Sequence, residues 1–90
     1  MVKEKTKTNK NEKGINSFTK ELFLHNDDFN TFDYVIDTLI EVCHHEPLQA
    51  EQCSMIVHYK GKCVIKTGLF DELKPKHDEL NRRGLTATIV

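Results

Sequence analysis

The sequence of 90 residues is poor in the residue types that define several common classes of protein. It contains no tryptophan, two prolines and four glycines. Its cysteines, Cys43, Cys53 and Cys63, are odd in number and lack paired spacing, which argues against a disulfide scaffold and favours a reducing compartment. We expect all three to be small core residues. No apolar run is long enough to cross a bilayer, and no signal-peptide pattern opens the chain, so we expect a soluble, cytoplasmic protein with no membrane partner.

Motifs that would indicate catalysis or a metal site are also missing. There is no glycine-rich phosphate loop, no Gly-x-Ser-x-Gly elbow and no His-Glu-x-x-His. Cys43, His44 and His45 are consecutive, and consecutive helical residues point about 100° apart, so they do not form a chelating set. Cys53 and His58 are turned about 140° apart on a helix, which does not favour a nucleophile pair. We therefore expect neither an enzyme nor a metal or other cofactor, and a small Cys/His metal-binding protein is the weakest alternative.

Lysine and arginine are absent from the whole segment between Lys20 and Lys60, which contains eight acidic residues. A segment of this charge repels phosphate backbones, so the sequence argues against nucleic-acid binding. By contrast, residues 1–14 carry five lysines against two glutamates. These residues have too few apolar groups to offset the entropy of ordering the chain. We therefore predict a flexible Lys-rich tail over residues 1–17 and one small folded domain over residues 18–90.

The first two helices are predicted by apolar spacing and by their end signals. Apolar residues at the helical interval predict a first helix over residues 31–44, capped by Asn30 or Thr31. His44 and His45 would then stabilise the negative end of its dipole. Proline is well tolerated at the first helical position, so a second helix starts at Pro47 and ends at the Gly61 stop signal.

Three short strands complete the pattern, over residues 22–24, 62–67 and 85–89. The second strand alternates at period two, which places Cys63, Ile65 and Thr67 on one covered side, and Gly68 is expected to end it. A third helix is expected to begin with Asp71 as its cap. Pro75 would then occupy the fourth helical position, where a missing N–H costs little.

The order strand, helix, helix, strand, helix, strand predicts an α+β fold. We expect a small α/β sandwich in which a three-stranded antiparallel sheet packs on three helices. The third helix should end at the signature Arg82-Arg83-Gly84.

Polar residues follow the first strand, in the run Asn26-Asp27-Asp28 that leads into the first helix. Such a corner can hold a small cationic group, although a solvated turn with a good helix cap has the same composition. His58 lies at the edge of the face of the second helix that should pack near the first. Taken alone, His58 is equally consistent with a partly buried histidine bonded to the backbone.

Taken together, these segments resemble the ClpS family of Clp protease adaptors. The resemblance rests on Leu-x-Asn-Asp-Asp at the strand end, on Phe-x-x-Val-x-Asp-x-Leu from Phe32 in the first helix, and on His58-x-x-Gly61. It extends from about Lys20 to Ile89. It implies an adaptor that binds substrates with a free N-terminal Phe, Leu, Tyr or Trp and delivers them to the N-terminal domain of a ClpA- or ClpC-like AAA+ unfoldase.

The resemblance assigns two groups of residues to the substrate site. The α-amine would be bound by an acceptor set, because an α-amino group of pKa about 7.7–8.0 is mostly an ammonium at neutral pH. This set is Asn26, Asp27, Asp28 and His58. The resemblance also implies an apolar pocket for the first side chain, with a polar rim. Its wall is Phe32, Val35, Val57 and Leu85, and its rim is Asn30 and Ser54.

The sequence departs from the family pattern at several of these positions. Asn30 replaces the usual Thr or Ser, and Phe32 and Ser54 each replace a common Met, which changes the shape of the pocket. The region that carries part of the docking surface for the unfoldase is shorter than usual, and Asp71, Glu72 and Lys76 are its candidate docking residues. The main alternative is a non-catalytic protein-interaction domain of the same fold that does not recognise free amines.

Overall fold

The computed structural model describes residues 18–90, so the predicted tail over residues 1–17 lies outside the described part. Six elements follow one another in the predicted order of strand, helix, helix, strand, helix, strand. They are β2 (Thr19–His25), α3 (Phe32–Cys43), α4 (Pro47–Lys60), β3 (Lys62–Leu69), α5 (Phe70–Arg82) and β4 (Thr86–Ile89). The predicted α+β fold class is therefore confirmed.

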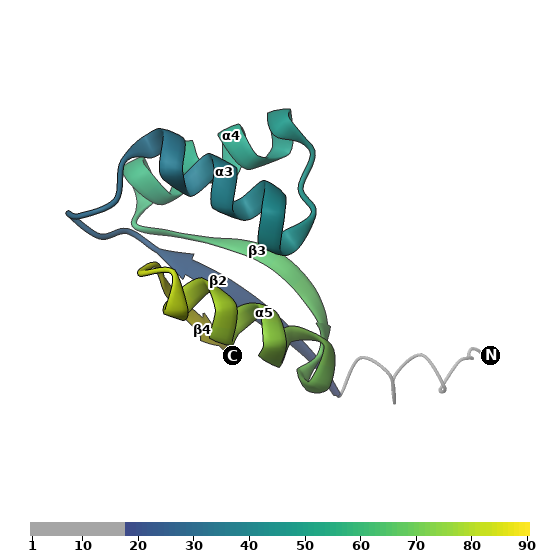
Figure 1. Ribbon diagram of the computed structural model, residues 1–90. Helices are drawn as coiled ribbons and strands as arrows, with labels where there is room; N and C mark the ends of the chain where they lie inside the picture. Colours follow the sequence, from purple (N-terminus) through teal and green to yellow (C-terminus); the bar gives the residue numbers. More distant parts are fainter. Residues whose placement is uncertain (1–17) are drawn as a thin grey trace.

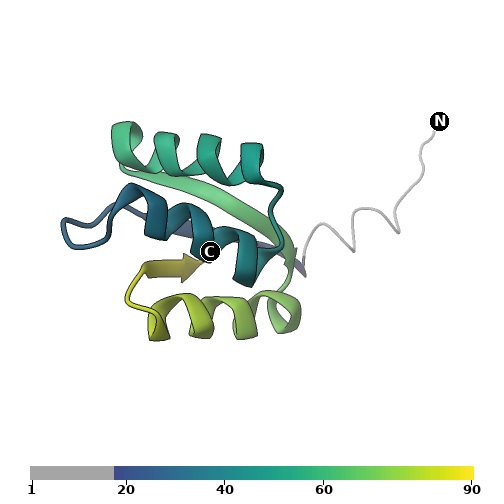
Figure 2. The same ribbon diagram turned by 45° about the horizontal axis from the view of Figure 1, so that its top comes forward.

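The three strands form one antiparallel sheet in the order β3-β2-β4. The helices lie side by side against one face of this sheet, with α3 between α4 and α5 (Figures 1 and 2). Burial follows this arrangement, because Leu22, Leu24 and Ala87 face the helices and are buried, whereas Thr86 and Thr88 face away and are exposed. The sheet thus has one covered face, as the strand alternation predicts.

The core fills the space between this sheet face and the helices. Leu39 of α3 and Leu73 and Leu80 of α5 have 0% of their surface exposed, and they pack in one cluster with the inward leucines of β2. Burial of each such side chain contributes about 1.5–3 kcal/mol. From α4 the core receives small residues, among them Ala50 and Cys53. Cys43 is also buried and Cys63 is half-buried, so the prediction of core cysteines is confirmed, and desolvation first of all raises the pKa of Cys53 to about 11.

A β-bulge in β3 corrects the predicted facing of Thr67. Leu22 pairs with Lys66 while Phe23 pairs with Val64, so one residue of β3, Ile65, has no direct partner on β2. A bulge inserts one residue and so reverses the alternation beyond it. Thr67 is therefore exposed and does not share the covered side with Ile65.

The start of α5 also differs from the prediction. Gly68 does not end the strand, because it still pairs with Lys20, and the helix cap is Leu69 rather than Asp71. The Leu69 amide donates to the side chain of Glu72 over 3.1 Å. A Cβ on Gly68 would lie 2.7 Å from this carboxylate, so a glycine allows the two segments to approach.

Pro75 is consequently the sixth residue of α5 rather than the fourth. Only the first four N–H groups of a helix lack an intrahelical partner, so a proline at this position removes one hydrogen bond. The helix nevertheless continues to Arg82 because Leu73 and Leu80 anchor it in the core on both sides of the proline.

The ends of α3 and α4 largely follow their local signals. Thr31 caps α3 and accepts a hydrogen bond from the Tyr34 amide over 3.1 Å, and Pro47 is the first residue of α4. Gly61 ends α4 with φ of 95°, a conformation that favours glycine. His45, two residues beyond the end of α3, is buried, and its Nε2 lies 2.7 Å from the carbonyl oxygen of Ile65, so it connects the end of this helix to β3.

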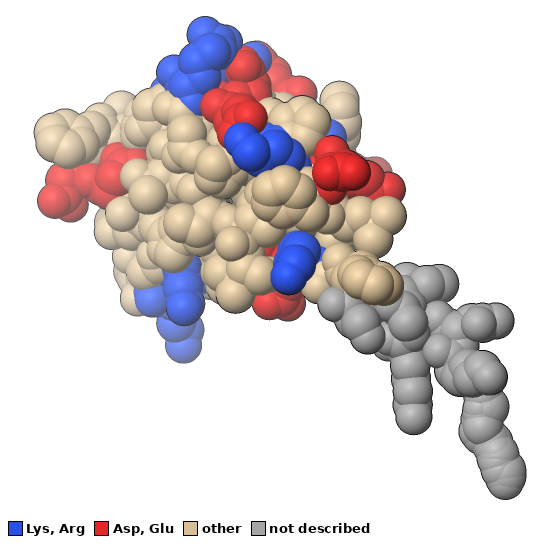
Figure 3. Space-filling model, turned by 90° about the horizontal axis from the view of Figure 1, so that it is seen from below, with Lys and Arg blue, Asp and Glu red and all other residues tan. Residues whose placement is uncertain are grey.

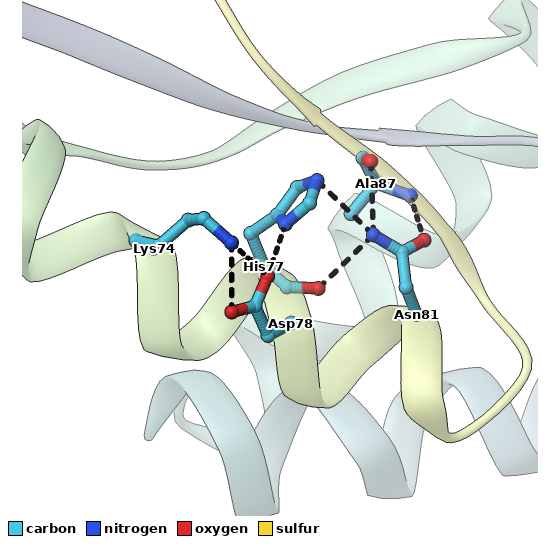
Figure 4. A network of polar contacts seen from close by, with 5 residues as sticks. All are labelled: Lys74, His77, Asp78, Asn81 and Ala87. Atoms are coloured by element: carbon cyan, nitrogen blue, oxygen red, sulfur yellow. Dashed lines mark hydrogen bonds and ion pairs between the residues drawn. The ribbon is translucent and has the colours of Figure 1, made fainter.

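The side chain of Asn81 forms hydrogen bonds that connect α5 to the short edge strand β4 (Figure 4). The Asn81 amide nitrogen donates to the Ala87 carbonyl over 3.2 Å, and the Asn81 amide oxygen accepts from the Ala87 amide over 3.0 Å. The same nitrogen lies 3.1 Å from Nε2 of His77, whose Nδ1 lies 2.9 Å from Asp78. Asp78 also pairs with Lys74 over 2.7 Å. Asn81 therefore satisfies backbone groups on the open edge of the sheet, where a further strand would otherwise bind.

Two general properties follow from the described helices and side chains. None of the helices over residues 18–90 is long and apolar enough to cross a membrane. Within the same residues, no group of three or more His, Cys, Asp or Glu side chains is arranged to hold a metal ion.

Candidate functional site

The loop between β2 and α3 meets the C-terminal turn of α4. The backbone amide of Asn26 donates to the carbonyl of Gly61 over 2.9 Å, which brings the polar run after β2 next to the turn that carries His58. A cavity of about 540 Å³ opens between these segments. It is lined by Asn26, Asp27, Asp28, Asn30, Phe32, Val35, Ser54, Met55, Val57, His58 and Tyr59.

The structure thus brings together nine of the ten predicted substrate-site residues. Leu85 is the exception, since it is 4% exposed in the core and is not among the lining residues. It directly follows the Gly84 turn, its amide donates to the Leu80 carbonyl over 3.0 Å, and its side chain belongs to the core cluster. Met55 and Tyr59 line the cavity although the sequence reasoning did not select them. They stand four residues apart on α4 beside His58, and this spacing could have identified them.

Asp27 organises the loop from within. One of its carboxylate oxygens accepts from the backbone amides of Phe29 and Asn30, and the other accepts from the Asn30 side chain, each over 2.9 Å. Partial desolvation raises the pKa of Asp27, but these hydrogen bonds outweigh it and the pKa lies below its ordinary value. Asp27 therefore stays ionised and shapes the mouth of the cavity.

Asn30 connects the same loop to the turn between α5 and β4. Its side-chain nitrogen also donates to the Gly84 carbonyl over 2.9 Å. Tyr34 makes a parallel connection, because its hydroxyl donates to the Arg83 carbonyl over 2.8 Å. The polar loop is thus fixed at both sides, by Gly61 and by the α5–β4 turn, and this arrangement pre-organises its side chains.

Three acceptor side chains at the cavity have no hydrogen-bond or ion-pair partner among residues 18–90. They are Asn26 and Asp28 from the loop and His58 from α4. The imidazole of His58 contacts the edge of the Tyr59 ring, with 4.9 Å between the ring centroids and 79° between the planes. The free acceptor atoms of Asn26, Asp28 and His58 suit a cationic ligand that carries several N–H donors.

The remainder of the cavity is mainly apolar. Phe32 and Val35 contribute from α3, and Met55 and Val57 contribute from α4. Phe32 remains 40% exposed and Met55 46% exposed, so both present apolar surface that a ligand could cover. A cavity with an apolar wall and a few convergent polar groups is the typical form of a small binding site.

The predicted docking residues lie apart from this cavity, on the first half of α5. Asp71 is exposed and Lys76 is half-buried. Glu72 accepts the hydrogen bond from the Leu69 amide, so part of its role is to cap the helix.

The surface charges agree with the charge pattern of the sequence. Seen from below, Lys and Arg side chains alternate with Asp and Glu around uncharged surface, and this face has no continuous basic area (Figure 3). An acidic group stands at the left margin, where Figure 1 places the loop between β2 and α3. The acidic residues of this loop, Asp27 and Asp28, both line the cavity.

The fold and the cavity define a small α+β domain that has, among the features of residues 18–90, a cavity with an acceptor-rich mouth and an apolar wall. The family model for the ATP-dependent Clp protease adaptor protein ClpS matches residues 18–88. The chain belongs to this family.

Individual relatives agree with the family match. The sequence is 38% identical over 67 residues to the ClpS adapter protein of Nitratidesulfovibrio vulgaris and 36% identical over 56 residues to that of Acetivibrio thermocellus. These segments span 70% and 62% of this chain and 67% and 57% of the two relatives. The structure of Agrobacterium tumefaciens ClpS2 bound to L-phenylalaninamide matches with a TM-score of 0.69 and 22% identity over 80% of this chain and 94% of that one, which supports the fold.

Proposed function

We propose that this protein is an adaptor that binds substrates with a free N-terminal bulky hydrophobic residue and delivers them to a Clp AAA+ unfoldase for degradation. The observation that carries the proposal is the convergence of three unpaired acceptors, on Asn26, Asp28 and His58, at the mouth of a cavity with an apolar wall. An N-terminal residue of this kind offers the complementary groups, since its ammonium has three donors and its side chain is apolar. L-phenylalaninamide, the ligand of the ClpS2 structure, has the same two groups.

The roles of the acceptors follow from their surroundings. The Asn26 carbonyl oxygen and a neutral His58 imidazole accept directly from the ammonium. Asp28 is exposed and contributes negative charge or a bridging water, while Asp27 contributes charge from its fixed position in the loop. This division leaves the loop geometry to Asp27 and the ligand contacts to its neighbours.

Approximate energies are sufficient for specific binding. Burial of one large side chain contributes about 1.5–3 kcal/mol, and each charge-assisted hydrogen bond contributes roughly 1.5–3 kcal/mol. Two or three such bonds and the side chain together reach about 5–12 kcal/mol, from which association costs of at least ~4 kcal/mol are subtracted. We expect dissociation constants near the micromolar range and a strong requirement for the free amine.

The test is fluorescence anisotropy with two labelled peptides that start with Phe and differ only in N-terminal acetylation. Acetylation removes the charge and donors, so we expect binding of the free-amine peptide alone. Affinity should also fall above pH 8, as the peptide ammonium loses its proton. Equal binding of both peptides would refute amine recognition and favour the alternative, a protein-interaction domain of the same fold.

Variants locate the site. Asp28→Ala and His58→Ala should each weaken binding of the free-amine peptide at least tenfold, because a charge-assisted contact is worth roughly 1.5–3 kcal/mol. Glu51→Gln is the matched control, since Glu51 is an exposed acid on α4 outside the cavity lining. Circular dichroism and thermal unfolding of each variant separate a loss of binding from a loss of fold.

Delivery is tested separately from binding. The variants for this test are Asp71→Ala and Lys76→Ala, because both residues lie on α5, apart from the cavity. We expect these variants to bind the Phe peptide normally but to slow degradation of a Phe-tagged substrate by the unfoldase and protease. Normal degradation with both variants would remove these residues from the docking surface.

A further inference from the structure

Ser54 places a buried and unsatisfied hydroxyl at the cavity. The residue lies on α4, is 3% exposed and is one of the lining residues. Its Oγ has no hydrogen-bond partner within the described residues. A buried hydroxyl without a partner costs free energy, and most buried polar side chains in native proteins are satisfied. A ligand that completes this hydrogen bond would recover that cost.

The position of Ser54 relative to His58 defines which part of a ligand could reach it. The two residues are four apart on α4, so their side chains lie on the same helix face, about 6 Å apart along the axis. His58 stands with the amine acceptors at the cavity mouth, and Ser54 lies one helical turn further along the wall. A ligand that places its amine at His58 therefore extends toward Ser54 over the length of an aromatic side chain.

The chemistry between these two polar points is apolar. Phe32 and Val35 of α3 and Val57 of α4 line the same cavity. The cavity thus offers an amine site, then an apolar wall, then a hydroxyl. An N-terminal tyrosine has the matching groups in the same order: an amine, an apolar ring and a polar tip. A leucine or phenylalanine lacks the tip, and the indole N–H of tryptophan branches from the side of its ring system rather than from its far end.

We infer that Ser54 is a specificity-determining residue that forms a hydrogen bond with the phenolic hydroxyl of an N-terminal tyrosine and so favours tyrosine over phenylalanine. This inference rests on the proposed function, because it assumes that the first residue of the substrate occupies the cavity. The bond satisfies two groups at once, the Ser54 hydroxyl and the tyrosine hydroxyl that loses its water on entry. A buried tyrosine without this partner would instead be penalised against phenylalanine.

The test is a four-way comparison of two peptides and two proteins. The peptides are identical except for Tyr or Phe at the first position, and the proteins are the natural chain and Ser54→Ala. We expect the natural chain to bind the Tyr peptide about 5–10-fold more tightly than the Phe peptide, and Ser54→Ala to lose this preference. Affinity for the Phe peptide should stay equal or rise in Ser54→Ala, because the variant removes an unsatisfied hydroxyl.

Two controls keep the result interpretable. Thr38→Val removes another buried helix hydroxyl, one that already donates to the Tyr34 carbonyl over 2.7 Å outside the cavity, and it should leave the Tyr to Phe ratio unchanged. Ser54→Cys replaces the hydroxyl with a weak hydrogen-bonding group and should resemble Ser54→Ala, which provides a second variant if the alanine form does not fold.

The outcomes separate this inference from the proposed function. If the Phe peptide binds the natural chain, but the ratio of Tyr-peptide affinity to Phe-peptide affinity is the same for the natural chain and Ser54→Ala, the inference is wrong and the adaptor function stands. If neither peptide binds the natural chain, both are wrong. Loss of the preference in both Ser54 variants, with the ratio retained in Thr38→Val, supports the inference.

Discussion

The side-chain nitrogen of Asn30 donates to the carboxylate of Asp27 over 2.9 Å, and the backbone amide of Asn30 donates to the same group over 2.9 Å. This pair closes the loop between β2 and α3 on itself. Because Asn30 also bonds Gly84, the closed loop is tied to the turn between α5 and β4. Asn26 and Asp28, two of the three acceptors at the cavity mouth, therefore stand on a loop with defined hydrogen bonds, which lowers the entropy cost of binding.

Asn30→Ala should loosen this loop. It removes the side-chain donor of Asp27 and leaves the Gly84 carbonyl without that bond. We expect the pKa of Asp27 to rise toward its ordinary value and the affinity for a Phe peptide to fall roughly 3–10-fold, the equivalent of about one hydrogen bond. An NMR titration of the Asp27 carboxyl carbon and anisotropy measure the two effects. An unchanged Asp27 titration would contradict this account.

Glu79 should contribute to acid sensitivity. Hydrogen bonds from Arg82 and then from Arg83 lower the pKa of Glu79 to about 2. A carboxyl with a depressed folded pKa stabilises the fold above its ordinary pKa of about 4.3, and this contribution is lost as the pH falls toward the folded value. Urea unfolding should thus show Glu79→Gln less stable than the natural chain at pH 7, with the difference shrinking between about pH 5 and 2.

The matched control for this titration is Glu51→Gln. Glu51 is exposed and has no ion pair among residues 18–90, so its replacement should leave the pH profile unchanged. If the free energy of unfolding of Glu79→Gln differs from that of the natural chain by the same amount at every pH down to 2, the ion pairs of Glu79 do not cause the loss of stability.

Asn81→Ala should destabilise the edge of the sheet. The substitution removes both hydrogen bonds between the Asn81 side chain and the backbone of Ala87. We expect a loss of about 1–3 kcal/mol in the free energy of unfolding by urea, and faster hydrogen exchange at the Ala87 amide. Lys74→Ala is the control, because Lys74 only makes an exposed pair with Asp78, which contributes about 0–1 kcal/mol.

Gly68→Ala tests the close approach at the start of α5. A Cβ at this position would lie 2.7 Å from the Glu72 side chain, which must then move and release the Leu69 amide. We expect a loss of about 0.5–1.5 kcal/mol, the value of one hydrogen bond, in urea unfolding. In a Glu72→Ala background the same substitution should cost little. Equal costs in both backgrounds would place the effect in the backbone rather than in this contact.

The local signals of the sequence were sufficient for most element ends. Thr31, Pro47 and Gly61 act within one helical turn, so their roles do not depend on distant segments. The signals at Gly68 and Asp71 were misleading because a contact with Glu72 and the pairing with Lys20 decide where β3 ends. Propensity is a weak guide wherever such tertiary contacts compete with it.

The candidate site shows the same division. Asn26, Asp28 and His58 could be selected from their residue types and from the family resemblance, and they do line one cavity. Leu85 is not among the lining residues for a tertiary reason, because it follows the turn at Gly84 and is buried in the core. The unsatisfied state of the Ser54 hydroxyl could not be predicted either, since it depends on every atom around it.

By itself the sequence determined the order of the elements, the apolar face of α3 and the residue types at the cavity, because periodicity and capping act over a few residues. The tertiary structure decided the bulge in β3 between the partners of Leu22 and Phe23, and with it the exposure of Thr67. It also decided that Asp27 is occupied by hydrogen bonds within its loop, whereas the other acceptors are free among the described residues. These features depend on hydrogen bonds and packing between segments far apart in the chain. The free energies of these hydrogen bonds and packing contacts are at least as large as the local propensities. Tertiary contacts therefore decide the structure where they disagree with propensity.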